Sequence, residues 1–213
     1  MKKTISIIFM FVLLAGSCVL LSACGKQDKT PPVSGGWAKL SSPVITQELR
    51  EIVAKAAAKE SGADYTPVAH LEEQVVAGMN HLVLCKKSTE AGESWVLVTI
   101  YADLNDDAKI TSELSCEAEV PFFGEGDGTW SESKDAAVSE ALESAIKKAN
   151  SVLAGGQYEP VALLGTQLVA GTNYCALCEL TATVPDAQPQ YVIATIYEDL
   201  NGNAEILNSA DFR

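Results

Sequence analysis

The chain has 213 residues, 28 of them acidic and 15 basic, and its formal net charge at pH 7 is −13. This negative charge argues against nucleic acid as a partner, because phosphates would be repelled, and it favours solubility and a basic partner. Without a leader peptide, the length suits two domains of roughly 90 residues each.

Residues 1–23 are predicted to be a signal peptide. Lys2 and Lys3 precede an apolar run from Ile5 to Leu21, which is at the short edge of what spans a bilayer. Leu21-Ser22-Ala23-Cys24 then matches the lipobox of bacterial lipoprotein precursors, in which the Cys thiol carries the lipid. We therefore expect an exported chain that is lipid-anchored to a bacterial membrane through Cys24. A transmembrane anchor is the rival interpretation.

Residues 24–34 are predicted to be a flexible tether, and residues 35–120 and 121–213 to be two copies of one domain. Gln74-Val75-Val76-Ala77-Gly78 returns 93 residues later as Gln167-Leu168-Val169-Ala170-Gly171. Trp37 aligns with Trp130, and the register holds for about fifty residues. A repeat at this spacing indicates a duplicated small domain.

Each copy is predicted to hold a short strand, a helix and four antiparallel strands. In the first copy, apolar residues recur at three- and four-residue steps between 49 and 57, which indicates a helix between Pro43 and Gly62. Strand-like segments follow at 66–75, 80–87, 95–104 and 108–114. In the second copy, the same stripe lies between Val138 and Ala149, and Asn201-Gly202-Asn203 marks a hairpin. This order predicts an α+β fold of two rolls, each with one helix packed on a sheet of four to five strands.

The two pentapeptides resemble the Gln-x-Val-x-Gly hairpin tip of the cystatins and stefins. Asn80 and Asn173 follow them at the family's spacing, and Gly35-Gly36 resembles the family's N-terminal trunk. The resemblance covers nearly the whole chain after Cys24, twice, and implies two cystatin-like rolls. It also implies a reversible wedge that blocks the active-site cleft of papain-like cysteine proteases. The trunk residues Gly35 and Gly36 and both pentapeptides would then contact the protease.

Some residues depart from the family pattern. Neither second hairpin, at 105–107 or 201–203, has the Trp or Pro expected there, and the second trunk has Gly128-Thr129 in place of Gly-Gly. We therefore expect the first copy to inhibit better by its trunk and the second by its first hairpin. One alternative is a cystatin-fold binding or assembly module without protease inhibition. Another is a structural repeat in which the pentapeptide merely makes a good turn.

Cysteines and histidines offer other chemistries. Cys175 and Cys178 are three apart, which puts them on opposite faces of a strand, so neither a redox nor a metal pair is expected. Cys85 and Cys116 could form a disulfide in an exported protein. His81 and Cys85 share a strand face at about 13 Å, too far for a thiolate–imidazole pair. His70 is expected on a strand surface.

Asp103-x-Asn105-x-Asp107 is similar to the start of a calcium loop but lacks the later Gly and carboxylate, so a polar hairpin turn is favoured. The sequence holds no nucleophile elbow, phosphate loop or carboxylate pair with a base. We therefore predict no enzyme activity, no cofactor and no metal site.

Overall fold

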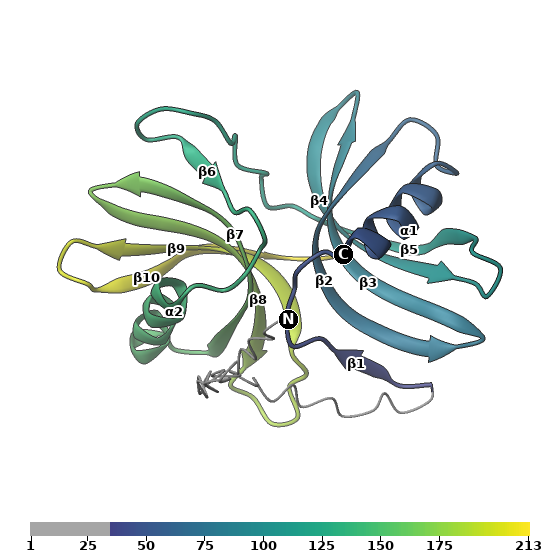
Figure 1. The fold of residues 1–213 in the computed structure, drawn as a ribbon. Helices are drawn as coiled ribbons and strands as arrows, with labels where there is room; N and C mark the ends of the chain where they lie inside the picture. Colours follow the sequence, from purple (N-terminus) through teal and green to yellow (C-terminus); the bar gives the residue numbers. More distant parts are fainter. Residues whose placement is uncertain (1–34) are drawn as a thin grey trace, which may run out of the picture. The chain divides into compact units, whose positions relative to one another are not determined.

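The computed structural model describes residues 35–213, which belong to one compact unit. The first half contains β1 (Trp37–Lys39), α1 (Gln47–Ala57), β2 (Asp64–Val76), β3 (Gly78–Thr89), β4 (Gly92–Ala102) and β5 (Ala108–Cys116). The second half contains β6 (Trp130–Glu132), α2 (Glu140–Val152), β7 (Gly156–Val169), β8 (Gly171–Ala182), β9 (Gln190–Asp199) and β10 (Ala204–Asp211). Both halves therefore repeat the predicted order of a short strand, a helix and four strands (Figure 1).

The predicted signal peptide, the lipidation site Cys24 and the tether lie outside the described residues. Within residues 35–213, neither helix has the length and apolar character needed to cross a membrane. The proposed division into domains 35–120 and 121–213 stays a prediction.

Each half forms one antiparallel five-stranded sheet. The strand order is β1-β2-β3-β4-β5 in the first sheet and β10-β9-β8-β7-β6 in the second. The long strand after each helix carries two register shifts, at Val68 and Leu71 in β2 and at Val161 and Leu164 in β7. Such bulges bend a strand and increase its twist, and here they occur at corresponding positions in both halves.

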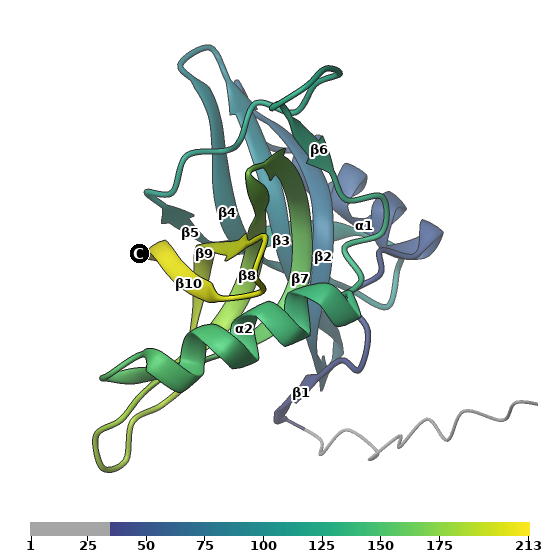
Figure 2. The same cartoon turned by 90° about the vertical axis from the view of Figure 1, so that its left-hand side faces the viewer.

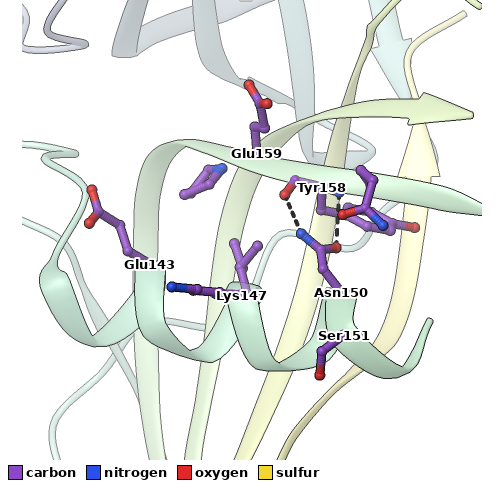
Figure 3. Close-up of a pocket in the computed structure, with 9 residues that line it drawn as sticks. Glu143, Lys147, Asn150, Ser151, Tyr158 and Glu159 are labelled. Atoms are coloured by element: carbon purple, nitrogen blue, oxygen red, sulfur yellow. Dashed lines mark hydrogen bonds between the residues drawn. The ribbon is translucent and has the colours of Figure 1, made fainter.

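Both helices begin at a capping side chain. The Thr46 hydroxyl accepts a hydrogen bond from the Leu49 amide of α1, and the Ser139 hydroxyl accepts one from the Leu142 amide of α2. These bonds satisfy amide groups that a helix N-terminus leaves free. Asn150 then fastens α2 to β7, because its Nδ2 donates to the Tyr158 carbonyl at 2.8 Å and its Oδ1 accepts from the Tyr158 amide at 3.1 Å (Figure 3).

Each helix buries its apolar stripe on one face of its own sheet. In the first half, Leu49, Val53 and Ala56 pack against strand residues that include Val83 and Val98. In the second half, α2 lies across the strands of the second sheet (Figure 2), where Leu142 and Ile146 pack among Ala176, Ile196 and their neighbours.

The other faces of the two sheets share a third core. Trp95, Leu84 and Leu97 of the first sheet are buried in the same cluster as Leu164 and Leu177 of the second. Polar contacts link the same two sheets. The Tyr191 hydroxyl donates to the Glu72 carboxylate at 2.8 Å, and the main chains of Ser115 and Arg213 exchange two hydrogen bonds of 2.8 Å.

The prediction of an α+β fold of two rolls was wrong. The described chain is mostly β, with ten strands and only two helices, of 11 and 13 residues. The physical reason is that the central strands are buried on both faces. Val83-Leu84-Cys85 and Trp95-Val96-Leu97-Val98 are buried at every position, because one face meets a helix and the other meets the second sheet. The roll prediction allowed each sheet only one buried face.

Candidate functional site

The two pentapeptides form the tips of tight hairpins, here called the hairpin tips (residues 74–78 and 167–171). β2 and β3 are joined through Ala77 alone, with Val76 paired to Gly78. β7 and β8 are joined through Ala170 in the same way, with Val169 paired to Gly171. The strands therefore stay paired up to the last residue before each turn.

Each tip is held closely against the neighbouring strand. Gly78 and Gly171 have φ angles of +127° and +134°, a region that L side chains rarely adopt. A Cβ at Gly78 would lie 2.3 Å from the Ala102 carbonyl oxygen, and one at Gly171 would lie 2.2 Å from the Glu198 carbonyl oxygen. The chain therefore requires glycine at both positions, for its conformation and for the close approach.

A tyrosine braces the turn in each half. The Tyr101 hydroxyl donates to the Ala77 carbonyl, and the Tyr197 hydroxyl donates to the Ala170 carbonyl at 2.7 Å. Both tyrosines come from the strand beside the hairpin, β4 or β9. Together with the packed glycine, this bond restrains the tip before any partner binds.

The glutamine of each pentapeptide connects the hairpin to the preceding trunk. Gln74 Nε2 donates to the Gly35 carbonyl at 2.9 Å, and Asn80 Nδ2 donates to Gln74 Oε1 at 2.7 Å. The second half repeats these bonds at 2.8 and 2.7 Å, with Gln167, Gly128 and Asn173. The predicted site residues Gly35, Gly36 and 74–78 are therefore brought together, and the Gln and Asn side chains hold them there.

The apolar residues of the tips differ in exposure between the halves. In the first tip Val76 is 40% exposed and Val75 is half-buried. In the second tip Leu168 is 76% exposed, and Val169 and Ala170 are exposed beside it. The second tip therefore presents more apolar surface to a partner than the first.

The second hairpins carry an apolar residue that the sequence analysis missed. Leu104 and Leu200 are each 83% exposed, because β4 ends at Ala102 and β9 at Asp199. The sequence analysis assigned Leu104 to the end of a strand. Met79 is paired with Ala102 across β3 and β4, so Leu104 lies at the same end of the sheet as the hairpin tip.

The rest of the second hairpin is a polar turn, as predicted. Asp103 Oδ1 accepts hydrogen bonds from the amides of Asn105 and Asp107 at 2.8 and 2.9 Å, and these bonds hold the pKa of Asp103 below its usual range. Asp199 accepts the equivalent bonds from Asn201 and Asn203. The carboxylate that resembled a calcium ligand therefore closes the turn.

The described cysteines are free and buried, so the possible disulfide between Cys85 and Cys116 is not formed. Cys85 packs in the core beneath α1, whereas Cys116 lies in the core shared by the two sheets. Cys175 and Cys178 lie in different cores, which confirms that they occupy opposite faces of β8. Burial raises the pKa of both thiols to about 12, which disfavours the thiolate needed for nucleophilic or metal chemistry.

His70, Glu73 and His81 form a cluster that the sequence analysis did not find. His70 and His81 are only 6% and 7% exposed, so the expectation of His70 on a strand surface was wrong. His81 Nδ1 lies 3.2 Å from His70 Nε2, and Glu73 Oε1 lies 3.5 Å from that His81 nitrogen. Burial lowers the pKa of His70 to about 4, with a further decrease from His81. Burial also lowers the pKa of His81, although Glu73 and Glu48 oppose this.

The bulge at Leu71 explains why the cluster was missed. On a regular strand, residues three apart point to opposite faces. The pairing of β2 with β3 shifts between His70 and Glu72, so Leu71 is an extra residue and His70 and Glu73 share a face. That face is the one beneath α1, because the groove beside the cluster is also lined by Thr46, Glu48 and Leu49.

A hollow of about 510 Å³ between α2 and β7 is a weaker candidate. Figure 3 shows Glu143, Lys147 and Glu159 around it, with Asn150 turned toward the main chain of Tyr158. The Asn150 side chain therefore holds α2 against β7 and is not free to bind a ligand in this hollow.

Comparison of the chain with known protein families gave no match, and comparison with curated proteins gave none either.

Proposed function

We propose that the protein is a reversible inhibitor of papain-like cysteine proteases, exported and held at a bacterial membrane by a lipid on Cys24. The observation that carries this proposal is the duplicated hairpin tip, with the same required glycine, the same tyrosine brace and the same glutamine link to the trunk in both halves. The cystatin resemblance assigns the protease-binding role to these same residues.

The tips suit a role as rigid wedges. A pre-organised loop loses little conformational entropy on docking, so a small contact area can bind tightly. The tip residues that remain exposed are apolar, and apolar side chains that enter a pocket supply most of the binding energy of an interface. Val76 and Leu168 are the leading contact residues of the first and second tip.

Leu104 and Leu200 are proposed as the apolar contacts of the second hairpins. The family places a Trp or an apolar pair there, and this chain offers one largely exposed leucine at that place in each half. A single leucine buries less area than a tryptophan, so we expect this contact to be weaker than its counterpart in other family members.

The two halves are expected to bind with different contacts. The first half has the Gly35-Gly36 trunk, whereas the second has the more exposed tip at Leu168. The trunk residue Gly35 donates its amide to the Val75 carbonyl at 3.2 Å, so trunk and tip would enter a cleft as one piece.

Inhibition of papain by the chain from Gly25 onward tests the proposal. The double variant Val76→Asp/Leu168→Asp places a charge on each exposed tip without touching the glycine or the tyrosine brace. We expect tight inhibition by the unchanged chain and a loss of at least about 30-fold in the variant, which corresponds to about 2 kcal/mol of contact energy. A matched control is Leu207→Asp, an exposed residue on β10 outside the tips.

Substitution of the glycines would not separate a binding role from a structural one. Because a Cβ at either glycine would meet a backbone oxygen, such variants would distort the hairpin whatever its function. Charged replacements at Val76 and Leu168 avoid this difficulty, since both residues are exposed and neither is a glycine of the turn.

The alternative function is that of a binding or assembly module without protease inhibition. It is favoured by the acidic second hairpin of the first half, where Asp103, Asp106 and Asp107 lie within three residues of Leu104 in the sequence. Folded protein that fails to inhibit papain and a panel of related proteases would support this alternative, and a basic protein would be the first partner to seek.

A further inference from the structure

The cluster of His70, Glu73 and His81 lies just behind the first hairpin tip, outside the proposed protease contacts. β2 supplies His70 and Glu73, and β3 supplies His81, which is paired directly with Glu73. One ring nitrogen from each histidine and one carboxylate oxygen lie within 4.8 Å of one another. Two imidazoles and a carboxylate form a ligand set that zinc uses in proteins.

The separations of the three atoms match those of ligands around one small ion. The nitrogen atoms are 3.2 Å apart, and Glu73 Oε1 lies 3.6 Å from His70 Nε2 and 3.5 Å from His81 Nδ1. Zinc bonds of about 2.0–2.1 Å at tetrahedral angles place neighbouring ligand atoms about 3.3–3.4 Å apart. We propose that His70, Glu73 and His81 bind one divalent transition-metal ion, with Zn²⁺ as the best match.

A simple hydrogen-bonded histidine pair accounts for less of this geometry. Such a pair explains the 3.2 Å contact between the rings, and strand pairing brings Glu73 beside His81, but neither accounts for the placement of the carboxylate oxygen between the two rings. The Glu73 oxygen is nearly equidistant from both nitrogens, and both distances exceed those of ordinary hydrogen bonds. An ion between the three groups satisfies all of them at once.

The surroundings favour a cation and leave room for a further ligand. The cluster opens into a groove of about 590 Å³, whose lining includes the acidic residues Glu48, Glu51 and Asp103 and one cation, Lys55, that is paired with Asp106. These carboxylates raise the local concentration of cations. Three protein ligands beside an open groove leave a fourth position for water, or for a group from a binding partner.

Among residues 35–213, the site belongs to the first half alone. The positions that correspond to His70, Glu73 and His81 in the repeat are Leu163, Thr166 and Tyr174, none of which forms a zinc ligand set. The backbone there has the same bulge and pairing. The chain should therefore bind one ion, and the second half shows which residues this backbone accepts when no metal site is present.

A bound ion would tie β2 to β3 just behind the first tip. Gly78 and Met79 line the same groove as the three ligands. Metal binding would therefore stabilise the first half of the chain, and this inference stands whether or not the tips bind a protease.

Zinc titration of the purified protein tests the site. The protein is stripped with EDTA, dialysed and titrated with ZnCl₂ against a chromogenic chelator. We expect one zinc ion per chain and a zinc-dependent rise in melting temperature. The variant His81→Tyr carries the residue that the second half uses, and we expect it to bind at least about 100-fold more weakly, since loss of even an outer-shell partner costs about 10- to 100-fold.

Two further variants keep the test decisive. Glu73→Gln alters the half-exposed ligand and serves if His81→Tyr does not fold. Glu51 lines the groove outside the cluster. We expect Glu51→Gln to change the affinity for zinc by less than about threefold, because exposed charges are screened. With Co²⁺ in place of zinc, intense visible absorption indicates four-coordinate metal and should be lost in His81→Tyr. Failure to bind one equivalent, or undiminished binding by folded His81→Tyr and Glu73→Gln, would overturn the proposal.

Discussion

The two halves of the molecule share one backbone but not one chemistry. Both have a helix capped by a hydroxyl, a long bulged strand, a glycine-dependent tip and a tyrosine brace. Beneath its helix the first half has His70, Glu73 and His81, whereas the second has Leu163, Thr166 and Tyr174. The same backbone therefore carries a histidine cluster in one half and none in the other, and the proposed metal site depends on these side chains alone.

The largest expected effect comes from breaking the core that the halves share. Trp95 is among the largest fully buried side chains and lies between the two sheets. We expect Trp95→Ala to lower the free energy of unfolding by about 3–5 kcal/mol. Since Trp95 packs against both sheets, the two halves should unfold together. Trp37 in the first half and Trp130 in the second should therefore report the same unfolding transition in urea. Two separate fluorescence transitions in the unchanged chain would contradict the coupling.

The second expected effect is a dependence of stability on pH that belongs to the first half. The pKa of His70 is about 4 in the folded chain, below the value of about 6.5 for an unfolded histidine. The unfolded chain therefore binds the proton more readily, and stability present above pH 6.5 should be lost as the pH falls toward 4, by up to about 3 kcal/mol.

Three titratable groups face His70 and can contribute to the same pH dependence. They are His81 from β3, Glu73 from β2 and Glu48 from α1. Urea unfolding at several pH values, with EDTA present to exclude metal, measures the effect. His70→Leu carries the residue of the second half and should flatten the profile between pH 6.5 and 4. An unchanged profile in this variant would show that another group causes the dependence.

A smaller effect is expected at the brace of each tip. Tyr197→Phe removes the hydroxyl that donates to the Ala170 carbonyl at 2.7 Å, and Tyr101→Phe removes its counterpart in the first half. Each should cost about 1 kcal/mol of stability. Equal losses, measured by urea unfolding, are expected because the two braces have the same partners; a loss in only one half would show that the tips are held differently.

The parts of the fold that depend on local sequence pattern could be predicted. The helices followed from apolar residues at helical spacing, and the hairpins from the glycine-containing pentapeptides between apolar segments. The fold class could not be predicted in the same way, because burial of Val83-Leu84-Cys85 on both faces depends on where the second sheet packs. The continuous apolar run was the available signal, and it was not used.

Only part of the candidate site could be predicted, because the rest depends on where strands end and bulge. Gly35, Gly36 and the first pentapeptide are close together, as the resemblance implies. Leu104 was missed because its exposure depends on β4 ending two residues before it. The cluster of His70, Glu73 and His81 was missed because a bulge changes which residues share a face, and no residue type near Leu71 marks that bulge.

The central claim is that the exposed tips are the binding elements, and inhibition constants for papain test it most directly. The chain from Gly25 onward would be compared with the single variants Val76→Asp and Leu168→Asp, each shown to be folded by its urea transition. We expect the unchanged chain to inhibit papain and both variants to inhibit it less tightly. The loss should be larger for Leu168→Asp if the second tip contributes more to binding than the first. Inhibition that is unaffected by either charge, or no inhibition of any papain-like protease by the folded chain, would contradict the account.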